Sequence, residues 1–202
     1  MNEELPFALQ ELRTDEVHTE NVVDKVASLL VDAVDNKVDE PVAIAFSGGV
    51  DSTVLALICE KLNKKFMLYC VGFEGSKDMV SAEEVAKEMR WELKKKVIVL
   101  DEMEEVFRKV ISLTGKCDPV TVGVGAVGYI VCSMAEEDLV MTGLGSEEIF
   151  AGYERHKGDI NKECWEGMLG IWERDVKRDL AIVESFEKKG CLPFMDKELI
   201  RY

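Results

Sequence analysis

"AIAFSGGVDSTVLA", residues 43–56, decides the fold of this chain. Its first four residues are apolar and predict a buried strand, whereas the apolar residues between Val50 and Leu62 recur at the spacing that buries one face of a helix. The stretch therefore predicts a strand, a tight turn and a helix. The turn holds two glycines, three hydroxyl side chains and one carboxylate, which is more than a simple connection needs.

The composition of this turn predicts a phosphate site. The two glycines let the backbone approach a ligand closely, and the free amides that open the helix favour an anion. The hydroxyls of Ser47, Ser52 and Thr53 can donate hydrogen bonds to phosphate oxygens. Asp51 would repel a phosphate unless it holds Mg2+, which bridges the two negative charges. A helix cap alone would need only one of these side chains.

Strand and helix patterns alternate along the rest of the chain. Strands are expected at 42–46, 66–73, 96–100 and 138–143, and helices at 19–37, 50–63, 81–90 and around 103–111 and 127–134. This alternation predicts an α/β fold, a parallel twisted sheet with helices on both faces that binds ligands at the carboxyl ends of its strands. From residue 146 on, the pattern is mostly helical.

The amino-acid composition indicates which binding partners and which cellular compartment to expect. The net charge of −15, from 25 basic and 40 acidic residues, disfavours tRNA and other polyanions as partners. There is no long apolar run and no apolar N-terminal segment, so we expect neither a membrane helix nor a secretory signal and place the protein in the cytoplasm. The six cysteines form no CxxC pair and are expected to be reduced thiols, with Cys59 and Cys70 in the core.

Two motifs together resemble a known family. SGGVDST, residues 47–53, resembles the pyrophosphate loop of the ATP pyrophosphatases, the PP-loop superfamily. TGLGSEEIFAGYERH, residues 142–156, resembles a segment of the asparagine synthetases and their β-lactam synthetase relatives. VGFEGSKD (71–78) and LPFMDKELI (192–200) resemble further elements of the same synthetase domain, in the same order. The resemblance covers most of the chain and implies an adenine nucleotide alpha hydrolase-like fold.

The resemblance also implies ligands and site residues. ATP and Mg2+ would be bound, with Asp51 and Glu147 as metal ligands and a nucleotide pocket formed mostly by backbone groups. The implied nucleotide and pyrophosphate residues are Ala45, Phe46, Ser47, Gly48, Gly49, Val50, Asp51, Ser52, Thr53, Val71, Gly143 and Ser146. We expect a single domain, with an N-terminal helical extension (1–40), a nucleotide-binding core (41–156) and a helical C-terminal part (157–202).

The chain departs from the family pattern at several positions. Leu144 stands where the family has a glutamate associated with amide formation, and a leucine can neither accept a proton nor orient an amine. The catalytic residue is therefore left unassigned. Gly190 and Cys191 stand near the place of a family arginine, and the family's lysine beyond the fourth element has no match before Tyr202. Candidate replacements for that lysine are Lys157, Lys177 and Arg178.

The same resemblance bears on partners. Glutamine-dependent members begin with a cysteine nucleophile after the initiator methionine, whereas this sequence begins Met1-Asn2, and residues 1–40 are too few for a glutaminase domain. Ammonia is therefore expected to come free or from a separate partner protein, or not to be the substrate at all. Apolar helices near the C-terminus are compatible with a homodimer.

The expected function is an ATP-dependent adenylating enzyme of asparagine synthetase type. It would cleave ATP to AMP and pyrophosphate and so activate a carboxylate for amide formation. Two alternatives stay open. One is another PP-loop ligase, such as an NAD synthetase-like or sulfur-transferring enzyme. The other is a nucleotide-binding module that has lost amide synthesis, which Leu144 favours.

Other conspicuous residues receive plainer interpretations. GVGAVG, residues 123–128, spells a dinucleotide-binding pattern, but it does not follow a first strand, so close helix packing or a loop wall is expected instead. Trp165 and Trp172 are expected in the core or at a dimer contact, and His18 and His156 at the surface.

Overall fold

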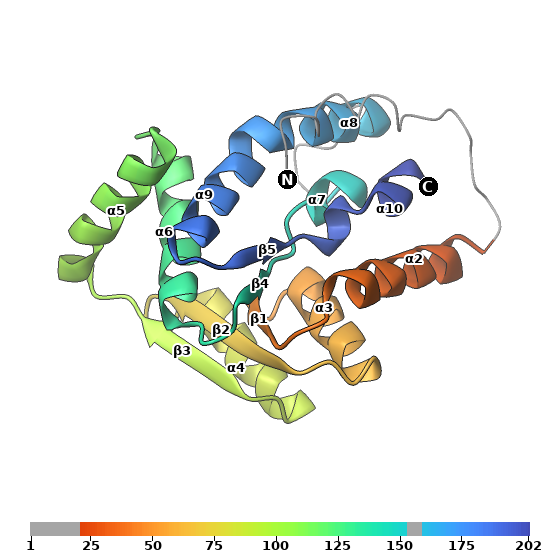
Figure 1. Cartoon of the computed structure of the whole chain (residues 1–202), viewed down its shortest axis with the longest axis horizontal. Helices are drawn as coiled ribbons and strands as arrows, with labels where there is room; N and C mark the ends of the chain where they lie inside the picture. Colours follow the sequence, from red (N-terminus) through yellow and green to blue (C-terminus); the bar gives the residue numbers. More distant parts are fainter. Residues whose placement is uncertain (1–20, 153–158) are drawn as a thin grey trace.

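A five-stranded parallel sheet forms the centre of the protein. The structure, a computed structural model, describes residues 21–152 and 159–202, and Figure 1 shows their arrangement. The strand order is β3-β2-β1-β4-β5, and every neighbouring pair is parallel. The strands are β1 (Val42–Ala45), β2 (Phe66–Gly72), β3 (Leu93–Val97), β4 (Leu139–Met141) and β5 (Lys189–Cys191). The expected α/β fold with a parallel sheet is therefore confirmed.

The central strands are continuous apolar runs because helices cover both faces of the sheet. β1 is VAIA and β4 is LVM, and their residues are buried apart from Ala45, which is partly exposed. Val42 of β1 lies in register with Phe66 of β2 on one side and with Leu139 of β4 on the other.

Helices pack on the two faces in two groups (Figure 1). The first face carries α2 (Val22–Lys37), α3 (Val50–Lys61), α4 (Lys77–Met89) and the short α10 (Lys197–Arg201). The second face carries α5 (Leu100–Thr114), α6 (Pro119–Met134) and α9 (Lys177–Ser185). Each group shares an apolar cluster with the sheet, and Cys59 and Cys70 are buried in the first cluster, as predicted.

A third cluster lies beyond the carboxyl end of β4. It is formed by α8 (Ile160–Ile171), the π-helical turn η1 (Trp172–Val176) and η2 (Pro193–Met195). Trp172 is buried in this cluster and Trp165 packs against it, so the prediction of core packing for the two tryptophans is confirmed. The short helix α7 (Ser146–Ile149) contacts α8.

Two strands differ from the prediction. β3 begins at Leu93 rather than at residue 96, and the apolar run that suggested the later strand ends in Val99 and Leu100, which are exposed where α5 begins. The observed strand LKKKV is at the sheet edge, where lysines discourage further strand pairing. β5 was not predicted, because KGC has no strand pattern of its own and gains its place by pairing with β4.

The GVGAVG run lies inside α6, and the predicted close helix packing is confirmed. A side chain at Gly125 would begin 2.7 Å from Val110 of α5 and 3.2 Å from Ile182 of α9, so this glycine allows three helices to approach closely. Within residues 21–152 and 159–202, no single helix is long and apolar enough to cross a bilayer. Only α5 and α6 taken together meet that test, and they are bent by 106°.

Candidate nucleotide site

The two motifs that carry the family resemblance flank the topological switch point of the sheet. From β1 the chain continues outward to β2 and β3 on one side, whereas β4 and β5 occupy the other side of β1. In open parallel sheets, ligands bind in the crevice outside the carboxyl ends of the two strands where this reversal occurs. The Ser-Gly-Gly turn follows β1 and the Gly-Leu-Gly turn follows β4, so both turns lie at that crevice.

Gly48 has a backbone conformation and surroundings that leave no space for a side chain. Its φ angle is +72°, and a Cβ atom there would lie 2.4 to 2.6 Å from backbone atoms of Ser81 and Ala82 in α4. The Ser81 hydroxyl donates a hydrogen bond of 3.1 Å to the Gly48 carbonyl oxygen. The turn after β1 is therefore fixed directly onto α4.

Two hydroxyl groups order the same turn from inside. Ser47 Oγ accepts a hydrogen bond of 3.2 Å from the Gly49 amide. Ser52 is buried, and its hydroxyl donates to the Gly49 carbonyl at 3.2 Å and lies 3.4 Å from the Ser47 amide nitrogen. Ser52 therefore stabilises the shape of the turn. From the sequence pattern alone, this structural role could not be distinguished from direct phosphate binding.

The N-terminus of α3 offers an anion site. Gly49 is its N-cap residue and supplies no capping side chain, and the amides of the first turn have no carbonyl one turn earlier to accept their hydrogen bonds. The helix dipole places partial positive charge at this end. The Thr53 hydroxyl is buried there without a hydrogen-bond partner among the described residues. These donors suit phosphate oxygens.

Asp51 brings the two motifs into contact. A Cβ atom built on Gly143, in the turn after β4, would lie 3.2 Å from the Cβ of Asp51 and 4.0 Å from the amide nitrogen of Ser52. The absence of a side chain at position 143 is what allows the first turn of α3 to approach this closely. Asp51, whose carboxylate is predicted to bind Mg2+, thus lies beside both turns.

The other acidic candidate lies on α7. Glu147 Oε2 lies where a side chain on Gly152 would begin, only 1.9 Å from the position of such a Cβ, so Gly152 leaves room for this carboxylate. No cluster of three His, Cys, Asp or Glu residues suited to a metal occurs in the described part of the chain. Mg2+ itself is usually held by one or two carboxylates, substrate phosphates and water.

The remaining predicted positions lie near the ends of β1 and β2 and at the start of α7. Ala45 is partly exposed, whereas Val71 is buried and the Phe46 ring packs 6.4 Å from the Trp91 ring, on the α3 and α4 face. Phe46 can therefore offer only backbone groups, in line with the predicted contacts. Ser146 is buried at the start of α7. His18, Tyr153, Arg155, His156 and Lys157 lie outside the described residues.

The second motif also packs against the fourth family element. Gly145 has a φ angle of +99°, and a Cβ atom there would lie 2.8 Å from the sulfur of Met195 in η2. The rings of Phe150 and Phe194 meet edge to face at 6.1 Å. Leu144 packs on the third apolar cluster, so an apolar side chain occupies the position where the family pattern has glutamate.

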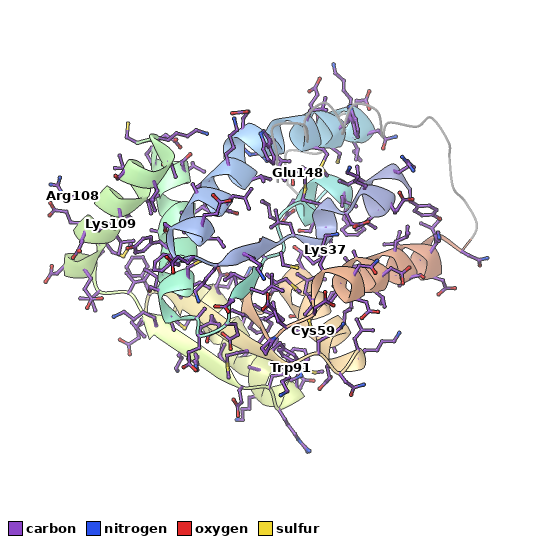
Figure 2. All side chains as sticks on the ribbon, in the orientation of Figure 1. Lys37, Cys59, Trp91, Arg108, Lys109 and Glu148 are labelled. Carbon is purple, nitrogen blue, oxygen red and sulfur yellow. The ribbon has the colours of Figure 1, made fainter. Side chains whose placement is uncertain are left out.

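A chain of ion pairs that the sequence analysis missed connects this motif to η1 and α9. Glu148 has a side chain that is 1% exposed, lies between α7 and α8 (Figure 2), and accepts a bond of 2.7 Å from Arg174. Arg174 also pairs with Asp175, and Arg178 pairs with Asp175 at 2.9 Å and with Asp179 at 2.7 Å. Burial raises the pKa of the Asp179 carboxyl, and Arg178 opposes that rise.

The sequence contained a signal for this chain of ion pairs. Arg174 and Arg178 are four residues apart and so share a helix face, and Glu148 is the second acid of the motif. Arg178, one of the candidate replacements for the family lysine, is already paired with two carboxylates. Lys177 is exposed and pairs with Glu173.

The fold and the two turns define a PP-loop nucleotide-binding domain. Residues 25–188 match the family model described as asparagine synthase, and this chain belongs to that family. It is 33% identical over 172 residues to a Methanocaldococcus jannaschii protein described as a glutamine-hydrolysing asparagine synthetase, covering 80% of this chain and 32% of that protein.

Two other proteins show the extent of the similarity. Asparagine synthetase B of Escherichia coli is 24% identical over 207 residues, which is 90% of this chain and 37% of that protein. The chain thus spans about a third of the length of these curated relatives. A solved NH3-dependent NAD synthetase of Campylobacter jejuni, in complex with nitrate, is similar with a TM-score of 0.45 and 18% identity, over 71% of this chain and 64% of that one.

Proposed function

We propose that this chain binds ATP with Mg2+ and cleaves it to AMP and pyrophosphate, activating a small carboxylate for amide formation. The observation that carries the proposal is the close approach of Asp51 and Gly143 at the open N-terminus of α3, where a Cβ atom on Gly143 would lie 3.2 Å from that of Asp51. It joins the pyrophosphate turn to the second family motif at the switch point of the sheet. The names of the relatives, which are glutamine-hydrolysing asparagine synthetases, support the same reaction class.

In this proposal the residues of the chain bind and orient the triphosphate. The amides of Val50 and Asp51 and the hydroxyls of Ser47 and Thr53 donate to the β and γ phosphates, while Gly48 and Gly49 let the backbone approach them. Asp51 and Glu147 would hold Mg2+, which neutralises phosphate charge when it is bound. The backbone around Ala45, Phe46, Val71 and Gly143 borders the nucleoside.

The chemistry follows from this orientation. A carboxylate oxygen attacks the α-phosphorus, a new P–O bond forms, and the bond to the bridging oxygen breaks so that pyrophosphate leaves with the bonding electrons. An amine nitrogen then attacks the acyl carbon, AMP leaves with the electrons of the broken C–O bond, and the amine releases a proton to water. The relatives' names lead us to propose ammonia as the amine, supplied free or by a glutaminase partner.

A matched pair of variants tests the assignment of Asp51. Asp51→Ala removes the proposed metal ligand at the first turn of α3, and we expect Mg2+-dependent binding of ATP to weaken by roughly a hundredfold, because the phosphate charge loses its counter-ion. Asp101→Ala removes an exposed carboxylate from the first turn of α5, which follows the edge strand β3 rather than β1 or β4, and should leave ATP affinity unchanged. Titration calorimetry with and without Mg2+ measures both. Equal affinities for the two variants would contradict the metal role of Asp51.

A second candidate function rests on Leu144. This side chain packs on the third apolar cluster and can neither accept a proton nor orient an amine, so the domain would bind ATP without completing amide synthesis. Under this alternative the protein binds MgATP tightly but releases no AMP when carboxylate and ammonium are supplied.

A further inference from the structure

An apolar cavity of about 340 Å³ lies beside the candidate nucleotide site, within the size range of small-molecule pockets. It is bordered by the carboxyl ends of β1 and β4 and by α6 and α9. Ala45, Thr142 and Leu144 form its inner wall, so it adjoins the turns that follow β1 and β4. The remaining wall is largely aliphatic, with Val127 and Val131 from α6 and Ile182 from α9 among its members.

One glycine of the GVGAVG run, Gly128, leaves room in this cavity. Gly125 has no space for a side chain, because α5 and α9 pack against it. Gly128 lines the cavity, and a Cβ atom there would meet nothing within 4 Å. The same helix is thus tightly packed at one glycine and open at another, one turn further along. A larger residue at 128 would fill the cavity without displacing the helix.

The charges in the wall decide what kind of ligand fits. Arg178 and Asp179 are the charged residues that line the cavity, as far as the structure describes the chain. The Arg178 side chain is 3% exposed, and its guanidinium is bonded to Asp179 and to Asp175. A second carboxylate on a ligand would find this cation already paired and would have to be buried among aliphatic side chains, which is costly.

We propose that the cavity holds the apolar side chain of the carboxylate that is activated, so that the substrate is an aliphatic or aromatic monocarboxylate rather than a dicarboxylate such as aspartate. This inference rests on the proposed function, whose site adjoins the cavity through Ala45 and Thr142. The carboxylate end of the substrate would face the α-phosphate, and its hydrocarbon part would occupy the space beside Gly128. Leu144 then serves as an apolar wall of the acyl site.

Binding and turnover are measured separately to test this. Titration calorimetry with 4-phenylbutyrate and with aspartate, in the presence of Mg2+ and a non-hydrolysable ATP analogue, reports binding. AMP release from ATP with each acid reports turnover. We expect 4-phenylbutyrate to bind and to stimulate AMP release, and aspartate to do neither.

Two glycine variants of α6 locate the binding. Gly128→Leu fills the cavity and should weaken 4-phenylbutyrate binding by about tenfold or more while leaving ATP affinity unchanged. Gly123→Leu adds the same side chain at an exposed position of the same helix, where a Cβ atom also meets nothing within 4 Å, and should change neither affinity.

The outcomes separate this inference from the proposed function. AMP release with aspartate, unaffected by Gly128→Leu, overturns the apolar substrate and keeps the adenylating reaction. Weaker ATP binding in Gly128→Leu also overturns the inference of an apolar substrate, because the cavity would then hold the adenine base of ATP. Binding of 4-phenylbutyrate that Gly128→Leu abolishes, without AMP release, supports the cavity and contradicts the reaction. Failure of 4-phenylbutyrate to bind the wild-type protein overturns the inference.

Discussion

At the scale of single residues, the turn after β1 shows how a short motif acquires a fixed shape. The pattern Ser-Gly-Gly-Val-Asp-Ser-Thr is sufficient to predict a phosphate-binding turn, because those residue types have few other uses together. It could not predict that Ser81 would bond the Gly48 carbonyl or that Ser52 would bond the Gly49 carbonyl. The Ser81 bond joins residues 33 apart and requires α4 to be packed against the turn, so it depends on tertiary structure. The Ser52 bond joins residues three apart at the start of α3 and depends on the local shape of the turn.

Gly48 and Gly75 form a natural comparison. Both have φ angles near +70°, but a side chain at Gly48 collides with the α4 backbone, whereas one at Gly75 meets nothing within 4 Å. Gly75→Ala should lower the free energy of unfolding by about 1 kcal/mol, from backbone strain alone. Gly48→Ala should lower it by about 3 kcal/mol or more, because a steric clash adds to the strain. Urea unfolding monitored by circular dichroism measures both, and equal losses would show that the turn is not held against α4.

At the scale of secondary-structure elements, the strands in the centre were predictable and those at the edges were not. β1 and β4 are continuous apolar runs that only a doubly covered sheet explains. β3 has three consecutive lysines between Leu93 and Val97 at a sheet edge, and β5 is Lys-Gly-Cys, so neither is a continuous apolar run. The ion pairs of η1 and α9 were missed because the spacing of arginines along a helix does not show which carboxylates face them.

Arg174 should contribute strongly to stability because it neutralises a buried acid. In Arg174→Met the Glu148 carboxylate, whose side chain is 1% exposed, loses its ion-pair partner, and we expect the free energy of unfolding to fall by about 3 kcal/mol. Lys177 lies three residues after Arg174 and forms an exposed ion pair with Glu173. Lys177→Met breaks this pair and should lower the free energy of unfolding by about 0.5 kcal/mol or less. Chemical denaturation measures the free energy of unfolding of both variants. A loss of stability in Arg174→Met no larger than that in Lys177→Met would contradict a structural role for the buried chain of ion pairs.

At the scale of the whole molecule, two helical layers and a sheet bury four of the six cysteines. Burial raises the pKa of Cys191 to about 12 and those of Cys59, Cys70 and Cys132 to about 11. The composition predicted reduced thiols but could identify only Cys59 and Cys70 as core residues. Cys191 and Cys132 are buried by β5 and α6, whose positions depend on the assembled sheet.

The cysteines therefore report on the integrity of this layered core. At neutral pH iodoacetamide should modify the exposed Cys117 rapidly and the four buried cysteines only on unfolding, as peptide mass spectrometry would show. Because these thiols lose protons more easily in the unfolded chain than in the folded protein, stability should fall as the pH rises from about 9 towards 11. Cys132→Ala should flatten that decline. Rapid alkylation of Cys132 in the native protein would contradict the assigned packing of α6.

The measurement that tests the central claim most directly is the identity of the nucleotide released from ATP. The protein is incubated with α-labelled ATP, Mg2+, ammonium and a mixture of carboxylates that includes aspartate and apolar monocarboxylates, and AMP is separated from ADP. Attack at the α-phosphorus predicts AMP and pyrophosphate in equal amounts, lost in Asp51→Ala and retained in Asp101→Ala. Release of ADP, or ATP binding with no turnover under any of these conditions, would contradict the adenylating function.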